Sequence, residues 1–198
     1  CDELTPQAKR LGAVNTIVKK PDGTLWGHNT DYFGFLEMVK RSALNVQGKK
    51  ALVLGSGGAG VTASAVLTDL GATVITISRN GEHNYNNLHH HQDASIIVNA
   101  TPVGMYPNNG TAPISLSVFP RLEGVLDLIY NPFKTDLLLE AEEKGLVTLN
   151  GLYMLVAQAK ESAEYFSGTT ISNEKIKDVY CSLKLQMENI ILIGMPGS

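Results

Sequence analysis

The chain has 198 residues, of which 43% are hydrophobic and 18% charged, so it can bury a full core and has the length of one domain plus part of another. Its net charge of -3 at pH 7 shows no basic excess, which argues against nucleic acid or an anionic membrane surface as the partner. Apolar runs such as ALVLG are far shorter than the roughly 20 residues that span a bilayer, so no membrane segment is expected.

The two ends and the cysteines suggest a piece of an intracellular protein. The N-terminus, CDELTPQAKR, has neither an initiator Met nor the basic and apolar stretches of a secretory leader, so we expect a fragment. Cys1 and Cys181 lie far apart and form no metal-binding spacing or disulfide framework. They favour a reducing compartment, and we expect a cytoplasmic location.

Residues 12–28 predict a β-hairpin. Two extended segments, AVNTIVKK and TLWGH, flank the PDG turn at 21–23, which combines a fixed φ with a glycine that tolerates positive φ. The polar cluster at 29–31 then offers an N-cap for a helix that runs to about Ala43. The hairpin therefore leads directly into a helix.

From Lys50 the pattern alternates between strands and helices. The runs ALVLG, TVITISR, SIIVNA, GVLDLIY and LVTL predict short buried strands, and helices are expected at 60–70 and 135–144. This order predicts an α/β fold with a Rossmann-type, doubly wound parallel sheet. A long helix is expected at 152–166, followed by a linker and an amphipathic helix around 176–183.

A glycine-rich loop joins the first of these strands to the following helix. Its sequence GSGGAG matches G-x-G-x-x-G, in which glycines allow a tight turn, close approach of a pyrophosphate and close helix packing. This context predicts a dinucleotide site, and a plain glycine-rich turn is the alternative. The residues are Gly55, Ser56, Gly57, Gly58, Ala59 and Gly60.

The next strand ends at a basic residue, in the position where an NAD site usually has an acidic residue. Ser78 and Arg79 occupy this position, and the Arg79 guanidinium can bind a 2′-phosphate as a planar donor fork. We therefore expect NADP rather than NAD. A solvated arginine at a strand end is the alternative.

A second loop, NATPVGM, follows a strand at the edge where open α/β sheets bind ligands. The alternative is a rigid loop shaped by its proline and glycine. The residues we assign to the cofactor from this loop are Asn99, Ala100, Thr101, Pro102, Val103, Gly104 and Met105.

Polar residues outside these loops are candidates for substrate binding. Asn15 and Asp31 bracket the hairpin and can together orient a hydroxylated substrate; for Asp31, the position alone favours the alternative, an acid at a helix start. Gln158 flanks the apolar stripe of the long helix, where a surface or interhelical role is the alternative. The run of histidines at 89–91 predicts a surface loop and no metal site, because consecutive side chains do not converge.

Taken in order, these motifs resemble the shikimate dehydrogenase family over residues 1 to about 168. The landmarks that carry the resemblance are GAVNT at 12–16, GHNTD at 27–31, GSGGAG at 55–60, NATPVGM at 99–105, DLIYNP at 127–132 and GLYMLVAQA at 151–159. The family interconverts 3-dehydroshikimate and shikimate with NADP in aromatic amino-acid biosynthesis. The resemblance implies that residues 1–30 end a substrate-binding domain and that residues 31–168 form the NADP-binding domain.

The resemblance also assigns individual residues. Asn15, Asp31, Tyr130 and Gln158 fall at the family's substrate-contact positions, and Asp31 corresponds to the acid of its catalytic Lys/Asp pair. The cofactor site is further expected to include Leu128, Gly151 and Met154.

The chain departs from the family in two respects. The paired serines and the catalytic lysine of the family would precede this chain, and Lys9 lies on the wrong side of the motif, in an expected helix. We therefore expect this chain alone to bind cofactor but to be a poor catalyst. A second basic residue that often follows the position of Arg79 is absent from GEHNYNN, which weakens the expected preference for NADP.

The C-terminal string adds a second resemblance. After a linker at 169–186, residues 187–198 contain NIILIGMPGS, which looks like the first strand and the start of the phosphate-binding loop of shikimate kinase. A fused kinase in a bifunctional parent protein is the interpretation, and a chance apolar tail is the alternative. Two other functions stay open: a ligand-sensing module without turnover, and a quinate or shikimate dehydrogenase that uses NAD. A homodimer also stays open.

Overall fold

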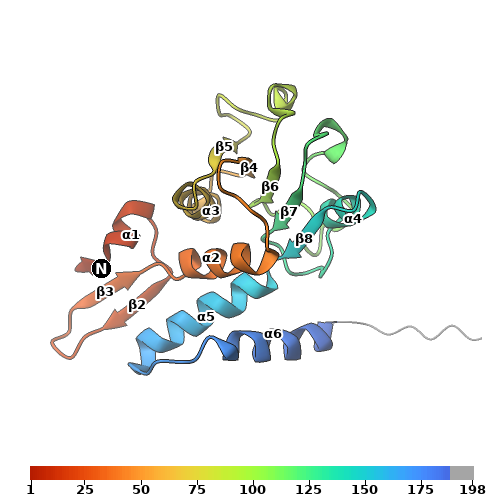
Figure 1. The fold of residues 1–198 in the computed structure, drawn as a ribbon. Coiled ribbons are helices and arrows are strands. Elements are labelled where there is room, and N and C mark those ends of the chain that lie inside the picture. Colours follow the sequence, from red (N-terminus) through yellow and green to blue (C-terminus); the bar gives the residue numbers. More distant parts are fainter. Residues whose placement is uncertain (188–198) are drawn as a thin grey trace, which may run out of the picture.

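The computed structural model describes residues 1–187 and contains two sheets (Figure 1). The smaller sheet has the strand order β1-β3-β2. It comprises β1 (Glu3–Leu4), β2 (Thr16–Lys19) and β3 (Leu25–His28), with α1 (Pro6–Leu11) beside it. The antiparallel pairing of β2 with β3 confirms the predicted hairpin, and α1 confirms that Lys9 lies in a helix.

The larger sheet has five strands, all parallel, in the order β5-β4-β6-β7-β8. Leu54 at the end of β4 pairs with Ile77 on one neighbour and with Asn99 on the other, so these three strands end at one edge. The predicted parallel sheet is confirmed. Its strands are β4 (Lys50–Leu54), β5 (Thr73–Ile77), β6 (Ile96–Asn99), β7 (Gly124–Asp127) and β8 (Val147–Asn150).

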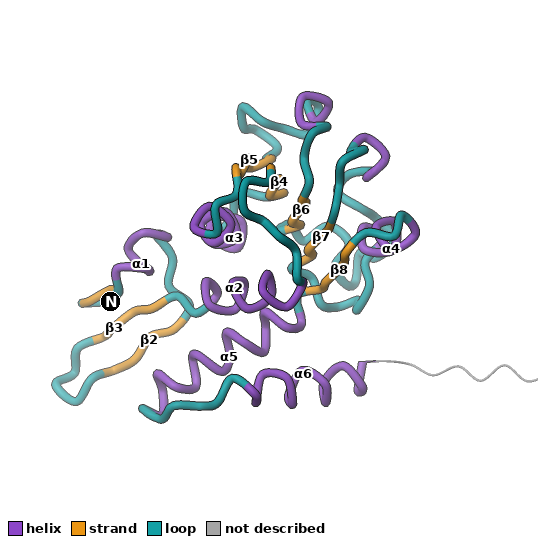
Figure 2. The backbone as a smooth tube through the Cα atoms, viewed as in Figure 1, coloured by secondary structure: helices purple, strands orange, loops and turns teal. Residues whose placement is uncertain are grey.

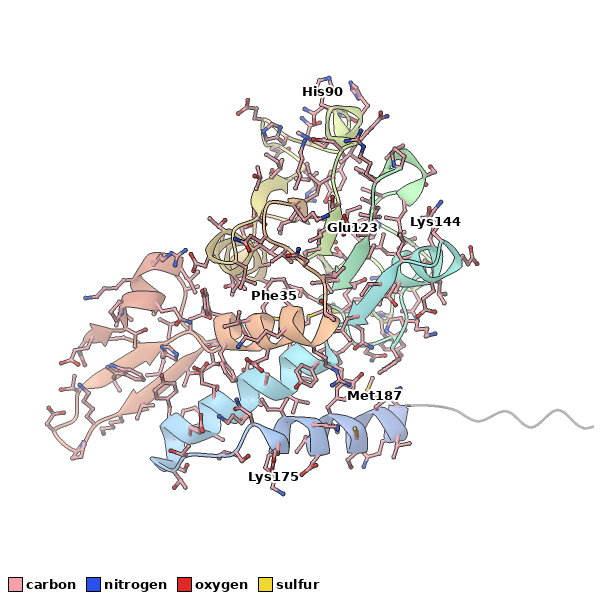
Figure 3. All side chains as sticks on the ribbon, in the orientation of Figure 1. Phe35, His90, Glu123, Lys144, Lys175 and Met187 are labelled. Atoms are coloured by element: carbon pink, nitrogen blue, oxygen red, sulfur yellow. The ribbon has the colours of Figure 1, made fainter. Side chains whose placement is uncertain are left out.

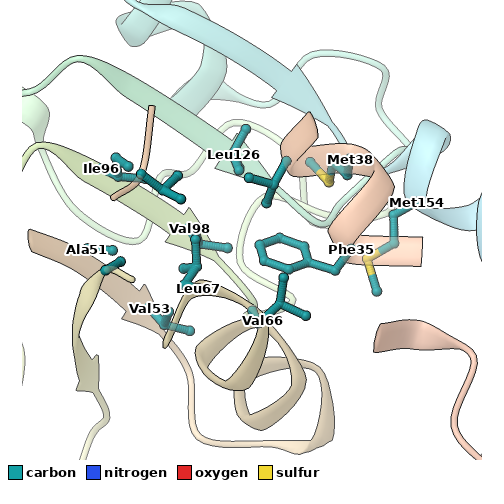
Figure 4. Close-up of a cluster of buried hydrophobic side chains, with 14 residues drawn as sticks. Phe35, Met38, Ala51, Val53, Val66, Leu67, Ile96, Val98, Leu126 and Met154 are labelled. Atoms are coloured by element: carbon teal, nitrogen blue, oxygen red, sulfur yellow. The ribbon is translucent and has the colours of Figure 1, made fainter. Parts of the chain in front are cut away.

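Side chains alternate between the two faces of this sheet, as the pleat requires. Ala51 and Val53 contribute to one buried cluster, and Leu52 and Leu54 to the other. Figure 4 shows the first cluster, in which Phe35 packs among strand and helix side chains. Its helices are α2 (Asp31–Ser42), α3 (Gly58–Asp69) and the start of α5 (Leu152–Ser167), whereas α4 (Asp136–Glu143) and the short helix η2 (Leu116–Val118) cover the other face.

The last described helix, α6 (Glu174–Met187), packs on α5 through Ile176 and Tyr180. This confirms the predicted amphipathic helix, and Figure 1 shows α6 lying alongside α5. The assignment of 169–186 as a linker between domains stays a prediction. The kinase-like segment, apart from Met187, lies outside the described residues. Within residues 1–187, no helix combines the length and hydropathy needed to cross a membrane.

One helix start differs from the expectation, and at another the structure shows which residue of the predicted polar cluster accepts from the first turn. The helix expected from residue 60 begins at Gly58, because the glycine loop itself closes the first turn. Thr30 holds the N-cap position of α2 without capping it, and the Oδ1 atom of Asn29 accepts from the Tyr32 N–H instead, at 3.3 Å. The tube in Figure 2 also shows the long loops between β5 and β6 and between β6 and β7.

Candidate functional site

A crevice opens where the chain leaves the sheet on opposite sides. The strands β4 and β6 are neighbours, and β5 lies on the other side of β4, so the connections after β4 and β6 diverge at the carboxyl edge. Gly55 begins the first of these loops with φ +106°, and a Cβ there would lie 3.0 Å from the Ala100 carbonyl oxygen in the second loop. The two predicted glycine-containing loops therefore form the walls of one site.

The N-terminus of α3 faces this crevice without an internal cap. Gly57 is the N-cap residue and makes no side-chain cap, and within residues 1–187 no acceptor pairs with the N–H groups of Gly58, Ala59 or Gly60. Such free N–H groups and the helix dipole favour an anion. A Cβ on Gly60 would lie only 2.1 Å from the Gly55 carbonyl oxygen, so the loop needs glycine at this position.

The first cavity, of about 580 Å³, lies beside this helix end. Arg79 stands exposed on its wall next to Ser78, with no acid at the end of β5. Tyr85, which the sequence did not single out, also lines it. The full lining is Gly55, Ser56, Gly57, Ser78, Arg79, Tyr85, Ala100, Thr101, Pro102, Val103, Ala112 and Pro113.

A second cavity, of about 420 Å³, shares the wall formed by residues 100–102 with the first. Tyr130 contributes to it and is 41% exposed. The lining is completed by Met105, Tyr106, Leu128, Ile129 and Asn131. The shared wall allows one extended ligand to occupy both cavities.

Three predicted cofactor residues line neither cavity. Gly104 has φ +93° and shapes the second loop, while a Cβ on Gly151 would lie 2.0 Å from the Leu128 carbonyl oxygen. Met154 is buried in the core, where a Cβ on Gly34 would lie 2.7 Å from its carbonyl oxygen. Gly104 and Gly151 therefore set the backbone geometry beside the cavities, whereas Met154 belongs to the core.

A buried carboxyl group fixes the loops around the crevice. Asp127 is fully buried and accepts hydrogen bonds from the Thr135 hydroxyl at 2.6 Å and from the side-chain amide of Asn99 at 3.0 Å. Asn99 in turn accepts from the Thr101 N–H at 3.0 Å. Burial raises the pKa of Asp127 to about 6, against the opposing effect of its hydrogen bonds. The DLIYNP motif contains this residue, but no feature of the motif indicates its role.

Two of the predicted substrate residues, Asn15 and Asp31, lie together. The Oδ1 atom of Asn15 accepts from the Thr30 backbone N–H at 2.9 Å, which fixes the amide orientation. Burial raises the pKa of Asp31, and a hydrogen bond from Asn15 opposes this. No lysine or arginine forms an ion pair with Asp31 among residues 1–187.

Gln158 joins the same group through Thr30. Its Oε1 atom accepts from the Thr30 hydroxyl at 3.3 Å, and its Nε2 donates to the Leu155 carbonyl at 3.0 Å. The Ser162 hydroxyl lies 2.9 Å from the hydroxyls of both Thr30 and Thr16. We call Asn15, Thr16, Thr30, Gln158 and Ser162 the polar cluster. Tyr130 belongs to the second cavity instead, and no described hydrogen bond joins it to this cluster.

The histidine run differs from its prediction. His91 is only 5% exposed, so the predicted surface loop is wrong for this residue. The tight turn of η1 (Leu88–His91) directs neighbouring side chains to different sides, and His91 points inward to within 3.1 Å of His83.

Comparison with known proteins identifies the family. The chain is 35% identical to the NADP(+) shikimate dehydrogenase of Clostridium perfringens over 197 residues, covering 92% of this chain and 72% of that protein. The chain belongs to the shikimate dehydrogenase family. The resemblance drawn from the motifs is thereby confirmed for the dehydrogenase. No family model matches the chain.

Solved structures of the family share its fold. Shikimate dehydrogenase 1 of Peptoclostridium difficile is 42% identical with a TM-score of 0.87, covering 95% of this chain and 73% of that one. A chorismate mutase/shikimate 5-dehydrogenase fusion of Clostridium acetobutylicum is 34% identical with a TM-score of 0.88, over 93% and 72%. The Thermus thermophilus enzyme in complex with NADP(H) and shikimate is 32% identical with a TM-score of 0.80, over 91% and 72%.

Proposed function

We propose that this chain carries the NADP site and part of the substrate site of a shikimate dehydrogenase, an oxidoreductase that interconverts 3-dehydroshikimate and shikimate. The observation that carries the proposal is the pair of adjoining cavities beside the uncapped N-terminus of α3, in a chain of this family. The Thermus thermophilus relative was solved with NADP(H) and shikimate, which supports the same ligands here.

The residues present fit a dinucleotide. The free N–H groups of Gly58, Ala59 and Gly60 suit the pyrophosphate, and Arg79, exposed on the wall of the first cavity, suits a 2′-phosphate. The second cavity, walled by Leu128 and residues 100–102, suits the nicotinamide end. When bound, the cofactor supplies the hydride chemistry, and the protein supplies alignment and charge placement.

The polar cluster and Asp31 suit a polyhydroxylated ring. The Asn15 amide, oriented by Thr30, holds the Asp31 carboxyl, which is positioned to accept from a ring hydroxyl and to orient a proton donor. Among residues 1–187 no cation pairs with Asp31, so we propose that this chain by itself turns over little substrate. Tyr130, exposed in the second cavity, is assigned to the substrate by the family resemblance.

The cofactor assignment is tested by titrating NADP⁺ and NAD⁺ separately. Changing Arg79→Gln should weaken NADP⁺ binding by about 10- to 100-fold and leave NAD⁺ binding unchanged, because only NADP carries the 2′-phosphate. Arg121→Gln is the matched control, since Arg121 is exposed and outside both cavity walls. Equal affinities for NADP⁺ and NAD⁺ in the unaltered chain would refute the assignment of Arg79.

NAD use is the second candidate, because Arg79 has no second basic residue in the GEHNYNN segment that follows. The same titration distinguishes it. A sensing module is distinguished by activity: shikimate and NADP⁺ are added to the complete polypeptide, and absorbance of the reduced cofactor is followed. No turnover, with ligand binding unchanged by Asp31→Asn, would favour a sensor.

Three wider assignments are also proposals. The exposed, widely separated cysteines Cys1 and Cys181 support a reducing compartment such as the cytoplasm. A fused shikimate kinase rests on the sequence of residues 187–198 alone, and the Clostridium acetobutylicum relative is fused to a different enzyme, chorismate mutase. A homodimer stays a prediction, which the mass of the protein in solution would test.

A further inference from the structure

The loop after β5 forms one wall of the first cavity, and contacts made outside the cavity hold this loop in place. Ser78, Arg79 and Tyr85 line the cavity, and the chain then continues to η1 and β6. The loop folds back on itself, since the Ser78 N–H donates to the His83 carbonyl at 3.1 Å. A Cβ on Gly81 would lie 2.5 Å from the Ser78 hydroxyl oxygen, so this turn is tightly closed.

The side chain of His83 connects this turn to a buried residue. Its Nδ1 lies 3.1 Å from the Nε2 of His91, and the two rings meet edge to face with centroids 4.8 Å apart. His91 is 5% exposed and ends η1, whereas His89 and His90 next to it are exposed. In Figure 3 the labelled His90 lies at the end of the molecule away from α6.

The proton positions in this pair follow from burial. The Nδ1 atom of His91 is buried and has no hydrogen-bond partner, and an unpaired buried N–H is costly, so the proton belongs on Nε2. The Nε2–H of His91 then donates to the Nδ1 lone pair of His83. Adding a proton at this lone pair would set two N–H groups against each other and break the hydrogen bond.

Several charged groups face the pair. Lys50 on β4 is 2.7 Å from Asp93, and this contact lowers the pKa of Asp93. Burial, then Lys50 and His83, lower the pKa of His91, which keeps that ring neutral. His90 is the other titratable group that acts on His91.

We propose that His83, held by His91, is a positioning residue for the cofactor site, and that protonation of the pair releases the wall formed by Ser78, Arg79 and Tyr85. The inference rests on the proposed NADP site. His83 does not touch the cavity; it acts through the Ser78 contact and the loop. Because Arg79 directly follows Ser78, NADP⁺ binding depends on this contact more than NAD⁺ binding does.

We call the contact between His83 and His91 the clamp. Three variants test it: His83→Ala, His83→Asn and, as the matched control, His89→Ala, which alters an exposed histidine outside the pair. The Kd for NADP⁺ and for NAD⁺ is measured at about pH 8 and about pH 5.5, on either side of the ordinary histidine pKa. The NADP⁺ 2′-phosphate, with a pKa of about 6, also loses charge at the lower pH, which weakens binding in every variant. The unaltered chain should therefore lose about three- to tenfold more NADP⁺ affinity than His83→Asn does, the effect of one hydrogen bond.

The variants should separate positioning from general stability. His83→Ala should bind NADP⁺ more weakly than the unaltered chain at about pH 8, whereas His83→Asn, whose Oδ1 can accept from His91 without titrating, should match the unaltered chain at about pH 8 and bind more tightly than it at about pH 5.5. His89→Ala should follow the unaltered chain. If His83→Ala bound NADP⁺ as tightly as the unaltered chain at both pH values, the proposal would be overturned. A loss of affinity in His89→Ala as large as that in His83→Ala would also overturn it.

A second measurement does not need the cofactor. Hydrogen exchange of the Ser78 amide, which donates to the His83 carbonyl, should be faster in His83→Ala and at the lower pH after correction for intrinsic rates. Unchanged protection would overturn the clamp. Failure of the unaltered chain to bind NADP⁺ would instead count against the proposed function, and the Ser78 amide would still decide on the clamp.

Discussion

The two cavities and the polar cluster are formed by different kinds of chemical groups. Around the crevice, glycines and free helix N–H groups form the site, and a single loop of six residues supplies most of them. Around Thr30, side-chain hydroxyls and amides come from the hairpin, α2 and α5, up to 146 positions apart along the chain. We therefore expect the first region to fail when a side chain is added and the second when a polar atom is removed.

The largest effect should come from adding one carbon atom to the crevice. Gly60→Ala would place a Cβ 2.1 Å from the Gly55 carbonyl oxygen, so the turn must open, at a cost of about 3 kcal/mol in unfolding free energy. Gly58→Ala is the control, because a Cβ there meets nothing within 4 Å. It should be neutral or stabilising in chemical denaturation. Equal losses in the two variants would refute the close-packing argument.

Asp127→Asn should have the next largest effect, and the effect should depend on pH. The native pKa of about 6 lies above its ordinary value, so the folded state binds the proton more tightly. Stability should therefore fall by up to about 3 kcal/mol as pH rises from about 4 to about 6, and then level off. The Asp127→Asn variant should not show this pH dependence of the unfolding free energy. Its NH₂ group replaces an accepting oxygen, so one hydrogen-bond donor loses its partner, at a cost of about 1–3 kcal/mol.

Denaturation of both proteins across this pH range checks the sign. The loss on changing Asp127 should be larger near pH 4 than near pH 7. Asp136→Asn, at the start of α4, should leave the slope in place. If the pH dependence of stability persisted in Asp127→Asn, other carboxyl groups would be its cause.

Thr30→Val should act on the polar cluster alone. Thr30 is fully buried, and its hydroxyl reaches Asn15, Gln158 and Ser162. Removing it should cost about 1–2 kcal/mol and weaken shikimate binding, with NADP⁺ affinity unchanged. Thr30→Ser should restore both properties. An equal loss of NADP⁺ affinity in Thr30→Val would show that the two regions are not separate.

The smallest effect is expected at a surface contact between α1 and α3, outside both regions. Arg10 donates to both carboxylate oxygens of Asp69 at 2.7 Å, but the pair is exposed to solvent. Arg10→Ala should therefore shift the melting temperature by less than about 2 °C. A larger shift, lost in high salt, would show that this pair holds α1 against α3.

The crevice loop is local in the sequence, whereas the polar cluster is assembled from distant positions, and this difference decides what the sequence could predict. The glycine loop was predictable because its function depends on spacing within six residues and on a strand before it. Thr30 and Ser162 were not, because a hydroxyl 132 positions from its partner leaves no local pattern. Asn15, Asp31 and Gln158 were named from motifs, and only the fold shows that Thr30 joins them.

Two other residues show the limits of local reasoning. Asp127 lies in a motif that was recognised, yet its role depends on burial and on donors from β6 and α4. His91 was assigned to the surface because adjacent histidines diverge; the divergence is real, and it turns one of them inward. Chain connectivity predicted the sheet, whereas the direction of single side chains required the tertiary structure.

The tight crossing at Gly34 has a mechanical consequence. A Cβ on Gly34 would lie 2.7 Å from the Met154 carbonyl oxygen and 2.9 Å from the Gln158 Cβ, so α2 and α5 touch backbone to backbone. Such a contact has no side chain that can rotate and absorb a displacement. We therefore expect the two helices to move as one rigid unit, so that a displacement of Asp31 at the start of α2 also displaces Gln158.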